Sequence, residues 1–411
     1  MIVKQSSTSV DDTATAVGAR VTMDVLYLSP EFPPNFANFI LQLNRHGADV
    51  WALGEADFFD MPSPLRSAIR YYVRTDLASA TAVEMALEEL LNAKTSLGSP
   101  RRFDVVESHN EIWLGLEAHI NQLLTIPGIR PGDLERLKKK SAMKRLFIAC
   151  GLRTAPGERL KGAAHGLELA NALGFPLILK PDQGVGAGNI HRVSDRKQLT
   201  DLLPVLTGDY IMEGFVDAPI VSYDGLVDAH GDLLFENSLV YGDGVLAYVN
   251  GKDTFFYVDR HIPKPLRKIG RMLVAAFDIR RKFFHFEFFC LDDMYMPIEI
   301  NCRPPGGAIV DMMNYSVDDD LYAAYARMIT GRMDRVLNTA KKYYCAYVGR
   351  RDRDYLFSHD QLVRRLGAAL VEFGENPHIF QAAMSRYRYI IRSESRERLL
   401  ELSADVQRVT N

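Results

Sequence analysis

The sequence predicts a chain of mixed α/β and α+β architecture that begins with a Rossmann-like parallel sheet. Short apolar strands alternate with helical patterns between residues 23 and 123, and this alternation is typical of βαβ units. Residues 283–303 alternate apolar and polar side chains on both sides of a turn, as a β-hairpin does. From residue 343 onward, the order of strands and helices indicates a small C-terminal α+β lobe.

The composition limits the possible partners. The chain has 411 residues, which is long enough for two or three domains or lobes. Hydrophobic residues make up 47% and charged residues 25%, as is ordinary for a soluble globular protein. The net charge of −3 gives no reason to expect a nucleic acid or a membrane surface as a partner.

The cysteines and the N-terminus predict a cytoplasmic location. Cys150, Cys290, Cys302 and Cys345 form no Cys-x-x-Cys pair and lie in apolar runs, so we expect them to be reduced core residues. No apolar run reaches the length of a membrane span, and the N-terminus lacks a signal-peptide pattern. Residues 1–20 are rich in Ser, Thr, Ala and Asp and are expected to form a flexible leader.

Polar side chains follow the strands expected in the N-terminal region. Its strands and helices are expected at residues 23–29, 36–46, 48–53, 80–93, 103–108 and 112–123. Ligands bind at the carboxyl ends of parallel strands, so Glu31, Glu107, His109 and Glu111 are candidates for substrate contacts. The alternative is that each is an ordinary polar group of a surface loop.

A basic helix is expected over residues 133–150, with Gly151 as its C-cap. Such a charge run is normally a solvated helix face. The remaining elements are expected at residues 164–173, 175–180, 190–193, 209–216, 220–229, 233–240, 263–279, 318–330, 359–366, 387–392 and 395–408.

The loop at residues 181–189 carries three alternate glycines, Gly184, Gly186 and Gly188, between two expected strands. It matches neither G-x-G-x-x-G nor the P-loop, because Asn189 replaces the third glycine and no Gly-Lys-Ser/Thr follows. Alternate glycines let backbone N–H groups close over phosphate oxygens. The alternative is a surface hairpin without a ligand.

The hairpin at residues 283–303 has one apolar and one polar face. The apolar face carries Phe284, Phe286, Phe288, Ile298, Ile300 and Cys302. If the turn is centred on Asp293, Glu287 and Glu299 face each other across the two strands. Like charges directly opposite each other destabilise a sheet, and a bound divalent cation would remove that cost.

The polar face of this hairpin has the chemistry of a metal site. Glu287, Glu299 and Asn301 offer the oxygen donors that Mg²⁺ takes together with substrate phosphates. Arg303 would add a planar donor fork for a phosphate. The alternative is the solvated face of an ordinary hairpin.

The order of these signals resembles the ATP-grasp family over roughly residues 23–335. The matching signals are the basic helix ending at Gly151, strands ending in Lys180 and Glu213, the glycine loop, and Glu-x-Asn-x-Arg at residues 299–303. Within that family the chain resembles carboxylate–amine ligases related to carnosine synthase and bacterial L-amino acid or dipeptide ligases.

The resemblance implies a fold and a domain order. A pre-ATP-grasp Rossmann-like domain would be followed by a two-lobed ATP-grasp fold and the small C-terminal α+β lobe. The implied segments are a leader at 1–20, the Rossmann-like domain at 21–132, a small lobe with the glycine flap at 133–212, a large lobe with the metal site at 213–340, and the C-terminal lobe at 341–411.

The resemblance also implies site residues. Lys140 matches the first nucleotide-binding lysine, with Lys144 as the competing choice, and Lys180 matches the second. The remaining implied roles are the phosphate flap at Gly184, Gly186 and Gly188, the adenine hinge at Glu213, Phe215 and Val216, the metal ligands Glu287, Glu299 and Asn301, and Arg303 beside the transferred phosphoryl group.

One position departs from the family pattern. Relatives carry a carboxylate for the ribose hydroxyls about seven residues beyond the hinge glutamate, and this chain has Ile220 there. Either Asp217 replaces that carboxylate or the ribose is held in another way.

The implied activity is an ATP- and Mg²⁺-dependent ligase, with Mn²⁺ as a possible substitute metal. It would join a small-molecule carboxylate and an amine through an acyl phosphate and release ADP and phosphate. Homodimers are common in such folds. Two alternatives remain: an ATP-grasp carboxylase or thioester-forming ligase, and a non-catalytic ATP-binding regulatory protein.

Overall fold

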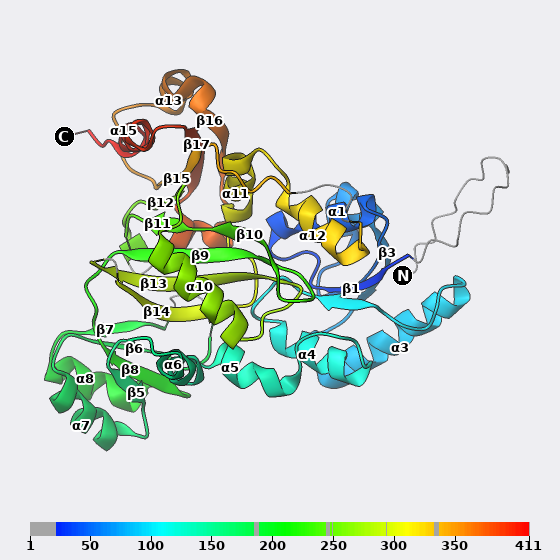
Figure 1. Ribbon diagram of the computed structural model, residues 1–411, viewed down its shortest axis with the longest axis horizontal. Coiled ribbons are helices and arrows are strands. Elements are labelled where there is room, and N and C mark those ends of the chain that lie inside the picture. Colours follow the sequence, from blue (N-terminus) through cyan, green and yellow to red (C-terminus); the bar gives the residue numbers. More distant parts are fainter. Residues whose placement is uncertain are drawn as a thin grey trace. The chain divides into compact units, whose positions relative to one another are not determined.

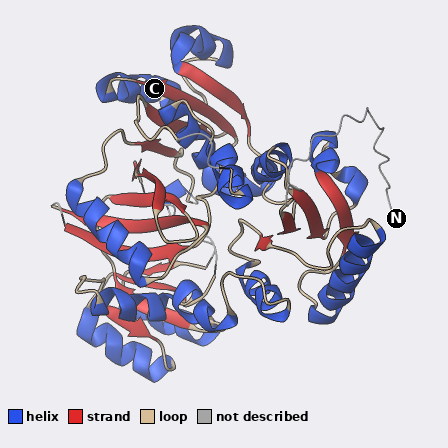
Figure 2. Cartoon of the chain, turned by 45° about the vertical axis from the view of Figure 1, so that its right-hand side comes forward, coloured by secondary structure: helices blue, strands red, loops and turns tan. Residues whose placement is uncertain are grey.

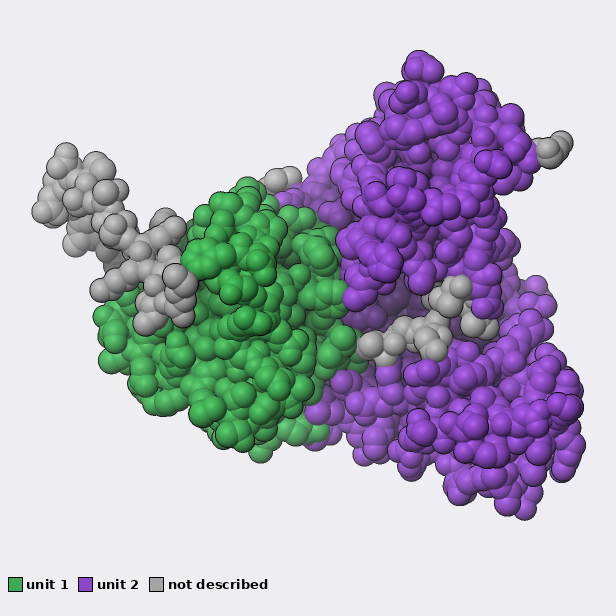
Figure 3. All heavy atoms as spheres, turned by 180° about the vertical axis from the view of Figure 1, so that it is seen from behind, with its two compact units in different colours: residues 1–131, 322–336 green, residues 132–321, 337–411 purple. Residues whose placement is uncertain are grey.

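The structure is a computed structural model with two compact units (Figure 3). The described residues are 22–184, 189–243, 247–248, 250–292, 294–332 and 337–410. Unit 1 comprises residues 1–131 and 322–336, and unit 2 comprises residues 132–321 and 337–411. Among the described residues, every helix is too short or too polar to cross a membrane.

Unit 1 contains the predicted parallel sheet, of which Figure 1 labels β1 and β3. Its strand order is β3-β2-β1-β4. Its strands are β1 (Asp24–Leu28), β2 (Asp49–Gly54), β3 (Ile69–Arg74) and β4 (Val105–Glu107). Its helices are α1 (Ala37–Arg45), α2 (Ser63–Ala68), α3 (Ala80–Ser96) and α4 (Leu114–Leu123), and most of α12 (Leu321–Thr330) belongs to it as well. All five residues of β1 are buried, as expected for an inner strand of a parallel sheet. The prediction of a Rossmann-like sheet is therefore confirmed.

Unit 2 begins with two helices where the sequence predicts one. The predicted helix over residues 133–150 is wrong in this respect, because α5 (Leu134–Lys138) and α6 (Lys140–Ala149) are separated at Lys139, whose backbone is extended. The cause is a tertiary contact. The backbone N–H of Lys140 donates to the carbonyl of Asp182 at 2.8 Å, and the Asp182 carboxylate accepts from Ser141 N and Ser141 Oγ, both at 2.7 Å.

The smaller sheet of unit 2 is antiparallel, in the order β5-β8-β6-β7. Its strands are β5 (Gly157–Arg159), β6 (Leu177–Pro181), β7 (His191–Val193) and β8 (Tyr210–Gly214), accompanied by α7 (Ala163–Leu173) and α8 (Arg196–Leu202). Leu179 and Met212 lie in its fully buried core. The predicted strand pair around the glycine loop is confirmed, because β6 and β7 are paired neighbours.

The larger sheet of unit 2 has nine strands, eight of them in the order β14-β13-β9-β11-β12-β15-β17-β16, and β10 pairs with β9. Figure 2 shows the strands of the chain in red and its helices in blue. Its first strands are β9 (Ile220–Val227), β10 (Leu233–Asn237), β11 (Leu239–Tyr241), β12 (Phe255–Val258), β13 (Lys282–Leu291) and β14 (Met294–Asn301). The C-terminal lobe adds β15 (Tyr344–Arg350), β16 (Leu370–Glu375) and β17 (Tyr387–Ser393) through the pairing of β12 with β15. The helices that accompany this sheet are α10 (Lys264–Ala276), α11 (Ile309–Val317), α13 (His359–Leu366), α14 (Gln381–Met384) and α15 (Arg396–Gln407).

The register of the β13–β14 hairpin is the predicted one. Glu287 pairs with Glu299, and His285 pairs with Asn301. The register shifts after Glu287, where Phe288 pairs with Pro297, which marks a β-bulge at this end of the site. The side chains of the three alternating phenylalanines are fully buried. Asp293, the predicted centre of the turn, lies outside the described residues.

Candidate functional site

Two strands of the small sheet and helix α6 bring three predicted residues into contact. Glu213 near the end of β8 accepts from Lys144 Nζ at 2.5 Å and from Lys180 Nζ at 2.8 Å. The Lys144 ammonium also donates to the carbonyl oxygen of Ala155. Both lysines are 8% exposed, so Glu213 joins two nearly buried ammonium groups.

The charges of this cluster stabilise one another. Burial alone would raise the pKa of Glu213, but Lys180 and Lys144 outweigh it and lower the pKa of the carboxyl group. Burial alone would lower the pKa of Lys180, but Glu213 outweighs it and raises the pKa of the ammonium group. Glu299 and Glu287 also raise it, so Lys180 lies within electrostatic reach of the hairpin carboxylates.

The hairpin carboxylate Glu299 contacts the other predicted lysine. The Lys140 ammonium lies 3.0 Å from Oε2 of Glu299, and the side-chain amide of Asn301 donates to Oε1 at 3.5 Å. Burial would raise the pKa of Glu299, but Lys140 and Lys180 lower it to about 2. Lys140 and Lys144 therefore hold different carboxylates of the same site.

The second hairpin carboxylate, Glu287, is supported by residues that the sequence analysis did not assign to the site. His285 Nε2 lies 3.4 Å from Glu287, and His285 Nδ1 lies 2.5 Å from the fully buried Asp224 in β9. Asp224 also accepts from Ser222 Oγ at 2.7 Å and from Asn237 Nδ2 at 3.0 Å. These contacts hold His285 between Asp224 and Glu287.

The surroundings of His285 favour its protonated form. Burial alone would lower its pKa, but Asp224 and Glu287 raise the pKa of the imidazole to about 9. His285 lies two residues before Glu287 in the alternating pattern and so falls on the same face of the hairpin, which is the signal that the sequence offers. Nothing in the local sequence indicated its partner Asp224, because the two residues are 61 positions apart.

The hairpin can accept a divalent cation at its polar face. Two carboxylates in register and the Asn301 side-chain amide provide oxygen donors of the kind that Mg²⁺ prefers. In the structure the Lys140 ammonium lies against Glu299, and the His285 imidazole lies against Glu287. Arg303 follows β14, is half-buried and donates from Nη1 to the carbonyl of Pro304 at 2.8 Å.

The predicted hinge and flap are only partly described. Phe215 donates its backbone N–H to the carbonyl of Pro176 at 3.0 Å, and the Arg192 guanidinium lies 4.2 Å from the centre of its ring. Val216 is half-buried and Gly184 is exposed. The other two flap glycines, Gly186 and Gly188, lie outside the described residues.

In unit 1, two of the four predicted polar residues, Glu107 and His109, belong to one buried network. Glu107 accepts from the backbone N–H of His109 at 3.0 Å and from the Tyr325 hydroxyl at 2.8 Å. The His109 ring stacks on Phe39 with centroids 3.8 Å apart. Glu107 and His109 are at most 2% exposed, so their contacts are those of a buried structural network. Glu111 is also buried, and Glu31 accepts from the backbone N–H of Glu55 at 2.9 Å.

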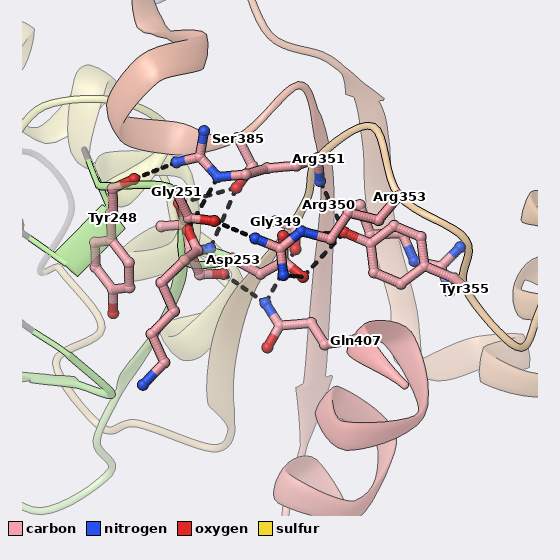
Figure 4. Close-up of polar contacts among 12 residues, drawn as sticks. Tyr248, Gly251, Asp253, Gly349, Arg350, Arg351, Arg353, Tyr355, Ser385 and Gln407 are labelled. Carbon is pink, nitrogen blue, oxygen red and sulfur yellow. Dashed lines mark hydrogen bonds and ion pairs between the residues drawn. The ribbon is translucent and has the colours of Figure 1, made fainter. Parts of the chain in front are cut away.

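A cavity of about 480 Å³ lies among the C-terminal strands. Beside it, the guanidinium of Arg351 donates to the carbonyls of Lys252 at 3.0 Å, Ala382 at 2.8 Å and Tyr248 (Figure 4). This arginine thus joins the segment before β12 to the C-terminal lobe. The cavity is lined by Arg350, Arg351, Asp352, Arg353, Tyr355, His359, Phe373, Gly374, Glu375, Tyr387, Arg388 and Tyr389.

Sequence comparison gives distant relatives. No family model matches the chain. An uncharacterized protein, y4rH, of Sinorhizobium fredii is 23% identical over 282 residues, which is 62% of this chain and 56% of that protein. The C-terminal section of the carbamoyl phosphate synthase large chain of Aquifex aeolicus is 21% identical over 168 residues, 38% of this chain and 30% of that protein. The chain thus spans little more than half of the first curated relative and less than a third of the second.

Structural comparison covers nearly the whole chain. An L-amino acid ligase from Bacillus licheniformis is similar with a TM-score of 0.70 and 16% identity, over 95% of this chain and 99% of that one. Phosphoribosylglycinamide synthetase from Anaerococcus prevotii is similar with a TM-score of 0.67 and 12% identity, over 95% of this chain and 99% of that one. N5-carboxyaminoimidazole ribonucleotide synthetase from Thermotoga maritima is similar with a TM-score of 0.64 and 15% identity, over 94% of this chain and 98% of that one. With its parallel sheet, its two antiparallel sheets and these likenesses, the chain has the ATP-grasp fold.

Proposed function

We propose that the chain is an ATP-dependent ligase that joins a carboxylate to an amine through an acyl phosphate and releases ADP and phosphate. The observation that carries this proposal is the pairing of Glu287 with Glu299 in register, next to Lys140 and within electrostatic reach of Lys180. Paired carboxylates can hold a metal ion and nearby lysines can bind phosphate oxygens, so this arrangement fits a nucleoside triphosphate with its metal. The similarity to an L-amino acid ligase over most of both chains supports this class of reaction.

The proposed reaction has two steps. A carboxylate oxygen of the first substrate attacks the γ-phosphorus of ATP, the bond between that phosphorus and the β–γ bridging oxygen breaks, and ADP leaves. The amine nitrogen of the second substrate then attacks the acyl carbon, the C–O bond to phosphate breaks, and the amine loses a proton. Such chemistry needs positioning and charge neutralisation more than covalent help from the protein.

Each site residue has a proposed role in this reaction. Lys140, Lys144 and Lys180 bind phosphate oxygens or orient Glu213, and Glu213, Phe215 and Val216 contact the adenosine. Glu287, Glu299 and Asn301 would hold Mg²⁺ or Mn²⁺, which supplies charge neutralisation at the terminal phosphates. Arg303 stabilises the charge on the transferred phosphoryl group. The proposed phosphate flap consists of Gly184, Gly186 and Gly188.

His285 has a positioning role in this proposal. Its imidazolium lies between Glu287 and the buried Asp224, which is itself held by two further donors. This arrangement fixes the direction of the Glu287 carboxylate, as supporting residues commonly do for metal ligands.

A second candidate function is an ATP-dependent carboxylation. The likeness to N5-carboxyaminoimidazole ribonucleotide synthetase is nearly as high as the likeness to the amino acid ligase. In that case bicarbonate would be the acid that receives the phosphoryl group, and the metal and nucleotide contacts would stay the same.

A phosphate-release screen tests both functions. The protein is incubated with ATP and Mg²⁺ and with amino acids, singly and in pairs, or with bicarbonate. A ligase releases phosphate only when a suitable acid is present, and more when an amine is added. Release with bicarbonate alone would favour carboxylation. The matched control is Glu299→Gln, and equal release by this variant would contradict the proposed site.

A further inference from the structure

Lys140 and a metal ion would compete for the same carboxylate. The Lys140 ammonium lies 3.0 Å from Oε2 of Glu299, and the Asn301 amide donates to Oε1 at 3.5 Å. Glu287 lies 3.4 Å from Nε2 of His285. Glu299 is therefore already paired with a protein cation, and a divalent ion bound to it would lie next to an ammonium group that repels it.

We propose that Lys140 makes metal binding depend on the nucleotide: a divalent cation binds Glu299 tightly only when phosphates draw the Lys140 ammonium away. This inference rests on the proposed function, because it names ATP phosphates as the anions that Lys140 contacts instead. The coupling is reciprocal, so bound metal strengthens nucleotide binding by the same factor.

The backbone around Lys140 is suited to this exchange. Lys140 is the first residue of α6, and its backbone N–H is fixed to Asp182 at 2.8 Å. The adjacent Ser141 is held by the Asp182 carboxylate through two contacts of 2.7 Å. The anchor is therefore rigid, whereas the long side chain of Lys140 has Glu299 as its ion-pair partner and can rotate toward phosphate.

Lys144 provides the matched comparison. It lies one helical turn further along α6, but its ammonium contacts both Glu213 and the carbonyl of Ala155. Replacing Lys144 by Met removes the same charge from the same helix without touching Glu299. A general effect of positive charge would appear in both variants, and an effect of competition for Glu299 would appear only at position 140.

The test is Mn²⁺ binding to the full chain without nucleotide, measured from the free-ion signal in electron paramagnetic resonance. Lys140→Met should bind Mn²⁺ about tenfold or more tightly than the wild type, and Lys144→Met should change affinity by less than about twofold. When ADP is added, the affinity of the wild type should rise by about tenfold and that of Lys140→Met much less. Circular dichroism melting checks that each variant is folded, and Lys140→Gln replaces Lys140→Met if the latter does not fold.

Equal Mn²⁺ affinity of the wild type and Lys140→Met would overturn the proposed competition, and so would an equal gain in both lysine variants. Failure of the proposed ligase function is a separate outcome. It would appear as an absence of ATP-dependent phosphate release in the substrate screen, and the Mn²⁺ measurements without nucleotide do not depend on that result.

Discussion

Glu299 is the residue on which the proposed chemistry depends most. It faces Glu287 in the register of the hairpin, forms an ion pair with Lys140 and accepts a hydrogen bond from Asn301. The facing carboxylates alone suggest that removing one charge would relieve repulsion. The contacts indicate the opposite, because Lys140 already pairs with Glu299 and His285 already lies against Glu287.

We predict that Glu299→Gln lowers ATP-dependent phosphate release at least about 100-fold, because a proposed metal ligand is lost. We also predict a loss of roughly 1–3 kcal/mol in the free energy of unfolding, because Lys140 loses its charged partner. Phosphate release and urea unfolding measure the two effects. Glu401→Gln, which affects an exposed pair with Arg398, is the control and should change neither. Unchanged release in Glu299→Gln would remove Glu299 from the site.

Lys341 is predicted to make stability depend on pH. Burial lowers the pKa of its ammonium group from 10.5 to about 7, although Asp224 and Asp259 act in the opposite direction. Between these two pH values Lys341 is protonated in the unfolded chain and deprotonated in the folded chain. Its contribution to the free energy of unfolding therefore rises as the pH increases from about 7 to 10. Below pH 7 the folded protein bears the desolvation cost of this half-buried ammonium group, which donates to the carbonyl of Asp259 at 2.8 Å.

Lys341→Met should therefore raise the free energy of unfolding by roughly 1–3 kcal/mol near pH 6, and the gain should shrink toward pH 10. Urea unfolding at several pH values measures this. The neighbouring Lys342 is exposed and pairs with Asp318, so Lys342→Met serves as the control. A gain that is the same at every pH, or a loss at pH 6, would contradict the assignment of the proton to Lys341.

The sequence allowed part of the site to be predicted at the scale of residues. Strand alternation and a short turn fix which residues of a hairpin face each other, so the pairing of Glu287 with Glu299 was accessible. The contact between His285 and Asp224 was not, because it depends on β13 lying next to β9 in the sheet. Local patterns carry no information on that neighbourhood.

At the scale of elements, the break between α5 and α6 shows the same limit. The residues on both sides favour a helix, and the acceptor that begins α6 is Asp182, 41 positions further along the chain. Short strands were also missed: β5 has three residues and is defined only by its pairing with β8. Elements with a strong internal period, such as α10, were predicted within a few residues of their bounds.

We predict that Asp182→Ala destabilises the protein by about 2 kcal/mol. The variant removes the two carboxylate oxygens that accept from Ser141 at the start of α6, and Asp182 is only 2% exposed. Asp182→Asn keeps one side-chain oxygen and should lose about half as much. Urea unfolding compares both variants with Asp201→Ala, a change at an exposed ion pair that should have little effect. An equal loss in all three variants would mean that Asp182 does not specifically hold the start of α6.

At the scale of the whole molecule, the fold class was predictable because most elements carry their own local pattern and occur in a recognisable order. The continuity of the large sheet was not. The C-terminal strands join it through the pairing of β12 with β15, and β12 itself was not predicted. The hairpin with the candidate metal ligands lies at one end of this strand order and the C-terminal lobe at the other.

The nucleotide product tests the central proposal most directly. Glu287, Glu299 and Asn301 would hold the metal at the terminal phosphates, so the β–γ linkage should break. The protein is incubated with ATP, Mg²⁺ and hydroxylamine together with acids that release phosphate in the screen, and nucleotides are separated by ion-exchange chromatography. We predict ADP and phosphate, a hydroxamate formed in an equal amount without any amine substrate, and none of these with Glu299→Gln. AMP and pyrophosphate as the main products would contradict both the proposed mechanism and the role given to Arg303.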